Sequence, residues 1–166
     1  MTPIRVFVHN VLSHKFLLRD TNTIYADISD KSILDQSYRY NLECQEITKN
    51  NPNIVCLQEV DTDFKECLIK NFGTLYDITY FEINTKENYG NLIMLQKNMF
   101  TNTKYVHTSC AMIMNLEINK INFVLCNIHL RTGRITGEQT RVCQIKSLIK
   151  NSTNCWKITM YLWRFQ

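Results

Sequence analysis

The chain alternates between short apolar runs and longer amphipathic segments, and these two patterns predict strands and helices respectively. The apolar runs are typical of strands and lie at residues 3–10, 53–58, 75–83, 89–96, 104–118 and 121–130. The amphipathic segments are typical of helices and lie at residues 33–50, 62–70 and 136–149. The polar residues at 13–32 predict a loop. Pro52 is expected to end the helix at 33–50.

The order of these elements predicts the fold class. Leu34, Tyr38 and Leu42 recur every four residues, which places them on one face of the first helix. The last helix is expected to turn four apolar residues toward the core: Val142, Ile145, Leu148 and Ile149. Strands that alternate with helices, followed by a run of strands and a final helix, predict an α/β protein whose mixed sheet is covered by helices.

Three of the apolar runs carry a polar residue at one end: Asn10, Glu59 and His129. Sites in open α/β sheets form beyond the strand ends, so these residues are expected to converge on one rim. Glu59 directly follows a run that looks fully buried, and burying a carboxylate is costly unless a cation or hydrogen-bond donors compensate. Glu59 is therefore either at the rim of the fold or holding something positive.

An amide, a carboxylate and an imidazole at one rim suit phosphoryl chemistry. The carboxylate would hold a hard divalent ion, the amide would orient a ligand or water, and the imidazole would contact a phosphate oxygen. Each residue also has a simpler interpretation: Asn10 as a turn or cap residue, Glu59 as a solvated side chain, and His129 as a satisfied surface or core residue.

Composition places the chain among ordinary globular proteins. Its 166 residues are 45% hydrophobic, which is enough for one core and one domain. No apolar stretch reaches the roughly 18 residues of a membrane span, and the N-terminus lacks the pattern of a signal peptide. We therefore expect an intracellular, cytoplasmic protein without a membrane partner. The seven cysteines include no C-x-x-C pair and favour reduced thiols over a zinc site.

Charge is distributed unevenly along the chain. Residues 1–85 carry 8 Lys and Arg against 12 Asp and Glu, a net charge of −4, whereas residues 86–166 carry 11 against 3, a net charge of +8. A basic second half suits a polyanionic partner, although a solvated basic face without a partner is equally compatible with it. No Asp follows Asp77.

Five stretches stand out by their order and spacing: VFVHNVLS at 6–13, SYRYNLECQEITKNNPNIVCLQEVD at 37–61, NYGNLIMLQKN at 88–98, NIHL at 127–130 and RVCQIKSLI at 141–149. Together they resemble the endonuclease/exonuclease/phosphatase superfamily, nearest its nocturnin-like deadenylase branch. The resemblance implies the N-terminal part of a DNase-I-like, two-sheet α/β sandwich. It also implies hydrolysis of phosphodiesters in nucleic acid, with RNA expected as the substrate, by a water activated with Mg²⁺ or Mn²⁺.

The resemblance also assigns roles to individual residues by motif position. Glu59 would be the metal ligand, Asn10 would lie beside the metal and phosphate, and His129 would contact the phosphate. Asn91 falls in the strand that lines the substrate cleft in the family, which implies a substrate-binding role. Catalysis would then involve Glu59, His129 and Asn10, and substrate binding Asn10, Asn91 and His129.

The sequence departs from the family after residue 150. Family members continue with a Gly-Asp-Phe-Asn strand and an Asp-His pair, and this chain has neither. We therefore expect residues 1–150 to be a partial domain and residues 151–166 an aberrant tail. One set of codons for Trp163-Arg164-Phe165-Gln166, shifted forward by one nucleotide, encodes Gly-Asp-Phe-Asn, so the tail is expected to be out of frame.

These departures predict weak or absent hydrolysis, since water positioning and charge stabilisation each contribute orders of magnitude in rate. The alternative is a non-catalytic remnant, or a protein that binds nucleic acid or another protein. A phosphodiesterase of lipid or inositol phosphates is a further alternative, which the helix before Glu59 disfavours.

Overall fold

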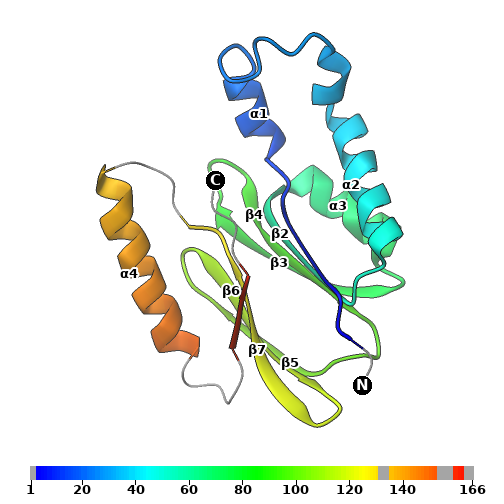
Figure 1. Cartoon of the computed structure of the whole chain (residues 1–166), viewed down its shortest axis with the longest axis vertical. Coiled ribbons are helices and arrows are strands. Elements are labelled where there is room, and N and C mark those ends of the chain that lie inside the picture. Colours follow the sequence, from blue (N-terminus) through cyan, green and yellow to red (C-terminus); the bar gives the residue numbers. More distant parts are fainter. Residues whose placement is uncertain (1–2, 131–134, 153–158, 163–166) are drawn as a thin grey trace.

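The computed structural model describes residues 3–130, 135–152 and 159–162, which form two β-sheets packed face to face with helices outside (Figure 1). Sheet A contains, in spatial order, β1 (Val6–Asn10), β2 (Ile54–Asp61), β4 (Tyr89–Gln96) and β3 (Tyr76–Asn84). Strand β1 is parallel to β2, whereas the other pairs are antiparallel. This mixed, two-sheet α/β arrangement confirms the predicted fold class.

Sheet B follows chain order. It contains β5 (Thr101–His107), β6 (Ala111–Ile118), β7 (Ile121–Ile128) and β8 (Thr159–Leu162). The first three strands pair antiparallel, and β8 lies parallel to β7 with Val124 opposite Thr159. The tail of the chain therefore contributes an edge strand to this sheet.

Four α-helices and one 3₁₀ helix complete the described part of the chain. They are α1 (His14–Asp20), the 3₁₀ helix η1 (Lys31–Leu34), α2 (Gln36–Asn50), α3 (Thr62–Phe72) and α4 (Ile135–Ser152). The Asp35 side chain caps α2 by accepting from the Tyr38 N–H at 2.9 Å. Helix α2 ends at Asn50, and the next residue, Asn51, has the left-handed conformation (φ 41°) typical of a residue just past a helix.

Three buried clusters hold the layers together. One packs α2 and α3 on the outer face of sheet A, and its members include Ile47, Phe64 and Leu68. A second fills the space between the sheets with residues such as Ile54, Ile93, Met112 and Leu125. The third lies on the outer face of sheet B, where Leu148 of α4 packs. Alternate residues of each strand thus face opposite layers, as the pleat requires.

Three expected elements differ in detail from the structure. The expected loop at 13–32 contains α1, which begins where Ser13 O accepts from the Phe16 and Leu17 N–H groups. The expected helix at 33–50 is broken at Asp35, because the Asp35 cap starts a new helix there. The expected strand at 104–118 is two strands joined by a turn in which the Thr108 N–H donates to Ala111 O at 2.9 Å.

Helix faces were predicted less well than helices. Tyr38 and Leu42 are about half exposed, and α2 instead packs Tyr40, Cys44 and Ile47 against sheet A. Tyr40, Cys44 and Ile47 recur at i, i+4 and i+7. The helical spacing was therefore predicted correctly, but the buried face is a different one.

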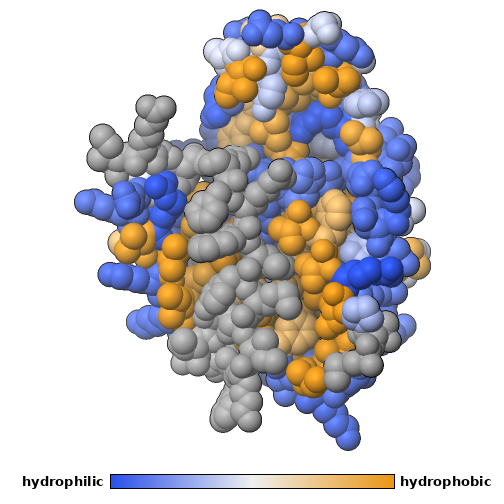
Figure 2. Space-filling view, in the orientation of Figure 1, coloured by the Kyte–Doolittle hydropathy of each residue, from blue (hydrophilic) through white to orange (hydrophobic). Residues whose placement is uncertain are grey.

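Helix α4 shows the same partial agreement. Leu148 is buried as predicted and Ile145 is partly buried, whereas Val142 and Ile149 are exposed. Exposed apolar residues also gather at the α1–η1 end of the molecule, at Leu18 and Ile24, where the space-filling view shows orange areas (Figure 2).

Three further expectations concern membrane-spanning helices, the cysteine thiols and the tail of the chain. In the described residues, no helix combines the length and hydrophobicity needed to cross a membrane. Cys56 and Cys110 are buried thiols in the core, where burial raises the pKa of the Cys110 thiol above its usual value. The out-of-frame tail proposed for 151–166 lies largely outside the described residues.

Candidate functional site

Glu59 lies at a β-bulge near the end of β2. The pairing of β2 with β4 passes from Leu57 opposite Leu92 to Val60 opposite Gly90, so β2 carries one extra residue at this point. Glu59 has a positive φ of 58°, a conformation that non-glycine residues adopt only at a cost in energy. Bulges re-aim side chains, and this one turns a carboxylate out of a strand whose eight residues are all buried.

The Glu59 carboxylate is only 4% exposed, and hydrogen-bond donors surround it. Asn10 Nδ2 donates to Oε1 at 2.8 Å, and the Ser13 backbone N–H donates to Oε2 at 3.3 Å. His129 Nε2 lies 3.8 Å from Oε1. Within the described part of the chain, Glu59 forms no ion pair with a Lys or Arg. A buried carboxylate that accepts hydrogen bonds only from neutral donors, with Arg19 of the cavity wall acting on it from a longer distance, can bind a cation.

The loop after β1 sets the orientation of Asn10. Strand β1 runs parallel to β2 and pairs Asn10 with Gln58, beside Glu59. The Leu12 N–H donates to Asn10 Oδ1 at 3.0 Å, which leaves Nδ2 directed at Glu59. Arg39 of α2 holds the same loop by donating to the carbonyl oxygens of Val11 and Leu12, the latter at 2.7 Å. The amide is thus fixed from both sides.

Buried amides tie the two sheets together next to this site. Asn127 Nδ2 donates to Leu57 O at 2.9 Å and Leu92 O at 3.0 Å, and Gln58 Nε2 donates to Asn127 Oδ1 at 2.7 Å. Asn91 Nδ2 donates to Asn127 O at 3.2 Å. Because Gln58 precedes Glu59 and Asn127 lies two residues before His129, this network fixes the position of Glu59 relative to His129.

His129 comes from sheet B, directly after β7. Its backbone N–H donates to Cys110 O at 2.8 Å, which anchors the residue to the turn between β5 and β6. Burial lowers the pKa of His129 below its usual value, and the nearby Glu59 carboxylate opposes this shift. The neutral imidazole is therefore favoured at neutral pH, where one ring nitrogen donates and the other accepts.

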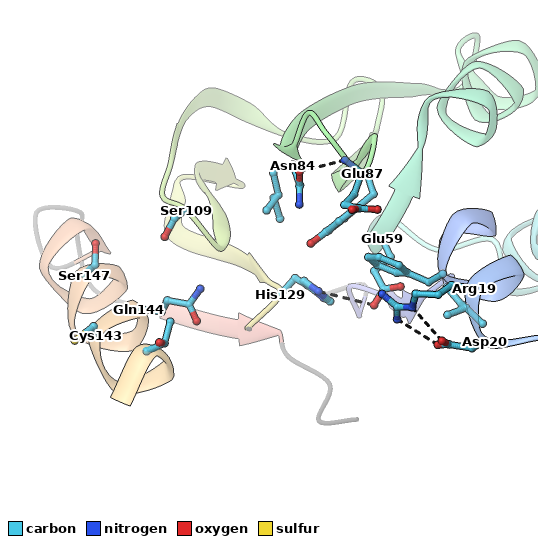
Figure 3. A pocket seen from close by; sticks show the side chains of 15 residues that line it. Arg19, Asp20, Glu59, Asn84, Glu87, Ser109, His129, Cys143, Gln144 and Ser147 are labelled. Atoms are coloured by element: carbon cyan, nitrogen blue, oxygen red, sulfur yellow. Dashed lines mark hydrogen bonds and ion pairs between the residues drawn. The ribbon is translucent and has the colours of Figure 1, made fainter. Parts of the chain in front are cut away.

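Glu59 and His129 lie on the wall of a cavity of about 860 Å³. Figure 3 shows Glu59 and His129 between the residues of α1, Arg19 and Asp20, and those of α4. Among the described residues, the charged side chains of the lining are three carboxylates and one guanidinium, from Asp20, Glu59, Glu87 and Arg19. Such a cavity attracts cations, and a phosphate group would need a cation to enter it favourably.

The donor set around Glu59 can hold a divalent cation of the Mg²⁺ type. Within the described residues there is no group of three His, Cys, Asp or Glu side chains that could form a complete protein cage. Mg²⁺ commonly keeps several waters and binds through one or two carboxylates plus substrate phosphates. Ser13 Oγ is buried here without a hydrogen-bond partner, and the same residue bonds Glu59 through its backbone. One carboxylate with an adjacent unsatisfied hydroxyl fits this mode of binding.

The structure places the predicted residues unequally. Asn10 and His129 both lie against Glu59, and Glu59 and His129 line the cavity, whereas Asn91 is fully buried between the sheets. The sequence analysis missed Ser13 and Asn127. For Asn127 a signal existed, since an amide inside the apolar strand at 121–130 must be hydrogen-bonded when buried.

The sequence matches no protein-family model, and no curated protein matches it significantly. Solved structures do match. ANGEL2, a 2′,3′-cyclic phosphatase, superposes with a TM-score of 0.73 at 17% identity, over 95% of this chain and 52% of that one. The catalytic domain of human Nocturnin gives a TM-score of 0.66 at 21% identity, over 96% of this chain and 62% of that one.

A third match belongs to a protein described by its superfamily. It is an endonuclease/exonuclease/phosphatase from Bacteroides vulgatus, with a TM-score of 0.67 at 15% identity, over 92% of this chain and 62% of that one. The chain thus spans about half to three-fifths of the length of these structures. Structural similarity at such low sequence identity shows the fold alone. It confirms the expected DNase-I-like fold. The chain has the fold of the endonuclease/exonuclease/phosphatase superfamily.

Proposed function

We propose that this chain carries part of a metal-dependent phosphodiesterase site that binds single-stranded nucleic acid, RNA foremost, with weak or no hydrolysis by the chain itself. The observation that carries the proposal is Glu59. A strained bulge directs its buried carboxylate to an open cavity, beside a neutral His129, and within the described residues it forms no ion pair with a Lys or Arg.

Each residue then has a role that its contacts support. Glu59 would hold Mg²⁺ or Mn²⁺, which supplies positive charge to a phosphate and acidifies a bound water. Asn10 keeps the Glu59 carboxylate oriented through the 2.8 Å hydrogen bond. His129, neutral and at the cavity, donates to a phosphate oxygen. Asn91, expected as a substrate contact, acts through Asn127 by keeping the sheets in register.

Nucleic acid is the proposed partner for two reasons. Among the structures with this fold, ANGEL2 was solved with adenosine-2′,3′-vanadate and D. rerio TDP2 with a single-stranded DNA product. The second half of the chain carries an excess of 8 positive charges, which suits a polyanion.

Low turnover follows from the composition of the site. Within the described residues, Glu59 is the carboxylate that lies against His129, and the other two carboxylates of the cavity pair with cations, Asp20 with Arg19 at 3.0 Å and Glu87 with Lys15 at 3.3 Å. General-base catalysis typically contributes about 10²–10⁴-fold in rate. Binding without hydrolysis is therefore the second candidate function, and the same observation favours it.

The test measures binding and cleavage of a labelled single-stranded RNA with Mg²⁺ and with EDTA. We expect binding that needs Mg²⁺, little cleavage, and loss of the Mg²⁺ effect in Glu59→Gln. Glu66→Gln is the matched control, because Glu66 is exposed on α3, away from the cavity. Binding that is indifferent to Mg²⁺, or equal Mg²⁺ effects in the two variants, would refute the proposal.

A further inference from the structure

Three aromatic rings form a continuous wall on one side of the cavity. Phe16 of α1 contacts Tyr89 at the start of β4, with ring centroids 4.9 Å apart and planes at 61°. Tyr89 in turn contacts His129, with centroids 6.1 Å apart and planes at 76°. All three rings line the cavity, and we call them the aromatic wall.

The aromatic wall is separate from the packing that stabilises the fold. Phe16 and Tyr89 are each only partly buried, and neither belongs to the three buried clusters that hold the layers together. A large aromatic side chain normally contributes its area to a core. Phe16 and Tyr89 instead line a cavity beside a candidate phosphate site. Their apolar area is therefore offered to a ligand.

The edge of the aromatic wall carries polar groups suited to a flat heterocycle. Arg19 lies over the Phe16 ring, with Cζ 5.0 Å from the centroid, and extends the stacking surface with a planar guanidinium. Figure 3 shows Glu87 and Asn84 on the side of the cavity above Glu59 and His129. One Glu87 oxygen pairs with Lys15 at 3.3 Å. Carboxylate oxygens accept hydrogen bonds from amino groups of bases.

We propose that the aromatic wall binds one unpaired nucleobase, with preference for bases that carry an exocyclic amino group. This inference rests on the proposed function, because it places the base of the same ligand whose phosphate lies at Glu59 and His129. His129 belongs to the aromatic wall and also to the proposed phosphate site, so the positions of the base and the phosphate are adjacent. Stacking on aromatic side chains and Arg is the usual way in which proteins hold single-stranded bases.

The experiment uses nucleosides, which lack phosphate, in EDTA, so that no contact between a metal ion and a phosphate contributes to binding. Binding of adenosine to the full chain is measured by NMR titration, with saturation transfer to identify the ligand protons in contact. Inosine, which has no amino group, is the matched probe. The base protons of adenosine should receive more saturation than its ribose protons, and inosine should bind more weakly.

Variants test the wall itself. Phe16→Leu and Tyr89→Leu keep apolar volume and remove the ring, and each should weaken adenosine binding about 5- to 150-fold, the range found for single base-stacking residues. Tyr38→Leu is the control, because Tyr38 is 49% exposed on α2 and lies outside the cavity. If a variant fails to fold, the saturation pattern on the wild-type chain decides.

Three results would overturn the inference: no adenosine binding at millimolar concentration, saturation confined to ribose protons, or equal losses in Tyr38→Leu and the wall variants. Equal binding of inosine would overturn the preference for amino groups. The proposed function has its own readout, the Mg²⁺-dependent binding of RNA that Glu59→Gln removes. Retained Mg²⁺-dependent binding with no nucleoside binding would therefore refute this inference alone.

Discussion

Replacing Asn127 by Leu should destabilise the fold severely, because Asn127 holds the two sheets together beside the candidate site. Its side chain is fully buried and makes hydrogen bonds of 2.9, 3.0 and 2.7 Å with Leu57 O, Leu92 O and Gln58 Nε2. Leu would remove all three bonds, leaving Gln58 Nε2 only its longer bond to Cys56 O at 3.4 Å, at about 1–3 kcal/mol for each group that loses its partner. At the middle of that range the three groups cost about 6 kcal/mol, and the added apolar burial offsets about 1.5–3 kcal/mol, so we expect a net loss of about 3–4.5 kcal/mol.

A loss of that size is a large part of the roughly 5–15 kcal/mol that stabilises an ordinary domain. Urea unfolding followed by circular dichroism gives the free energy of unfolding of each variant. Asn115→Leu is the matched control on the neighbouring strand β6, because Asn115 Oδ1 is buried without a hydrogen-bond partner. Removing the Asn115 side chain in this way should lower the free energy of unfolding only slightly, or even raise it. A loss below about 1 kcal/mol for Asn127→Leu, or equal losses in both variants, would refute this reasoning.

Three further predictions concern stability and association. Gly90→Ala should destabilise by about 1–3 kcal/mol in urea unfolding, because an added Cβ would lie 2.1 Å from Phe81 O; no measurable loss would contradict this. Burial raises the pKa of Tyr80 from 10.0 to about 12, so its contribution to stability is full below pH 10 and is lost as the pH rises toward 12. Tyr80→Phe should therefore lose less stability than wild type across pH 10–12, and identical alkaline profiles would exclude this cause. Ile24→Lys should reduce self-association in sedimentation experiments without changing the free energy of unfolding, because Ile24 is 72% exposed; unchanged association would show that this side chain does not drive it.

The fold class followed from element order, since runs at period two and segments at helical period alternate along the chain. Element boundaries failed where one polar residue decides the local structure. Asp35 ends the 3₁₀ helix and starts α2 by capping Tyr38, and no periodicity signals that event. The buried face of α2 was misjudged because Tyr38 and Leu42 are as apolar as the residues that actually pack, and only tertiary contacts select between them.

The sequence predicted that Asn10, Glu59 and His129 converge, which the structure shows, but it did not predict the geometry of their contacts. Asn10, Glu59 and His129 each end or interrupt an apolar run, which is why they stood out in the sequence. The bulge at Glu59 was not predictable, because it arises from the register of β2 against β4. The same holds for the burial of Asn91, which depends on how the two sheets face each other.

The central claim is that Glu59 is placed to bind a divalent cation, and Mn²⁺ binding measured by electron paramagnetic resonance tests it directly. Wild type and Glu66→Gln should bind Mn²⁺ weakly and alike, with affinity increased by a nucleotide phosphate that completes the oxygen ligands. Glu59→Gln keeps the size of the side chain and removes its charge, and it should lose this binding. Mn²⁺ binding that is equal in Glu59→Gln and wild type would contradict the account.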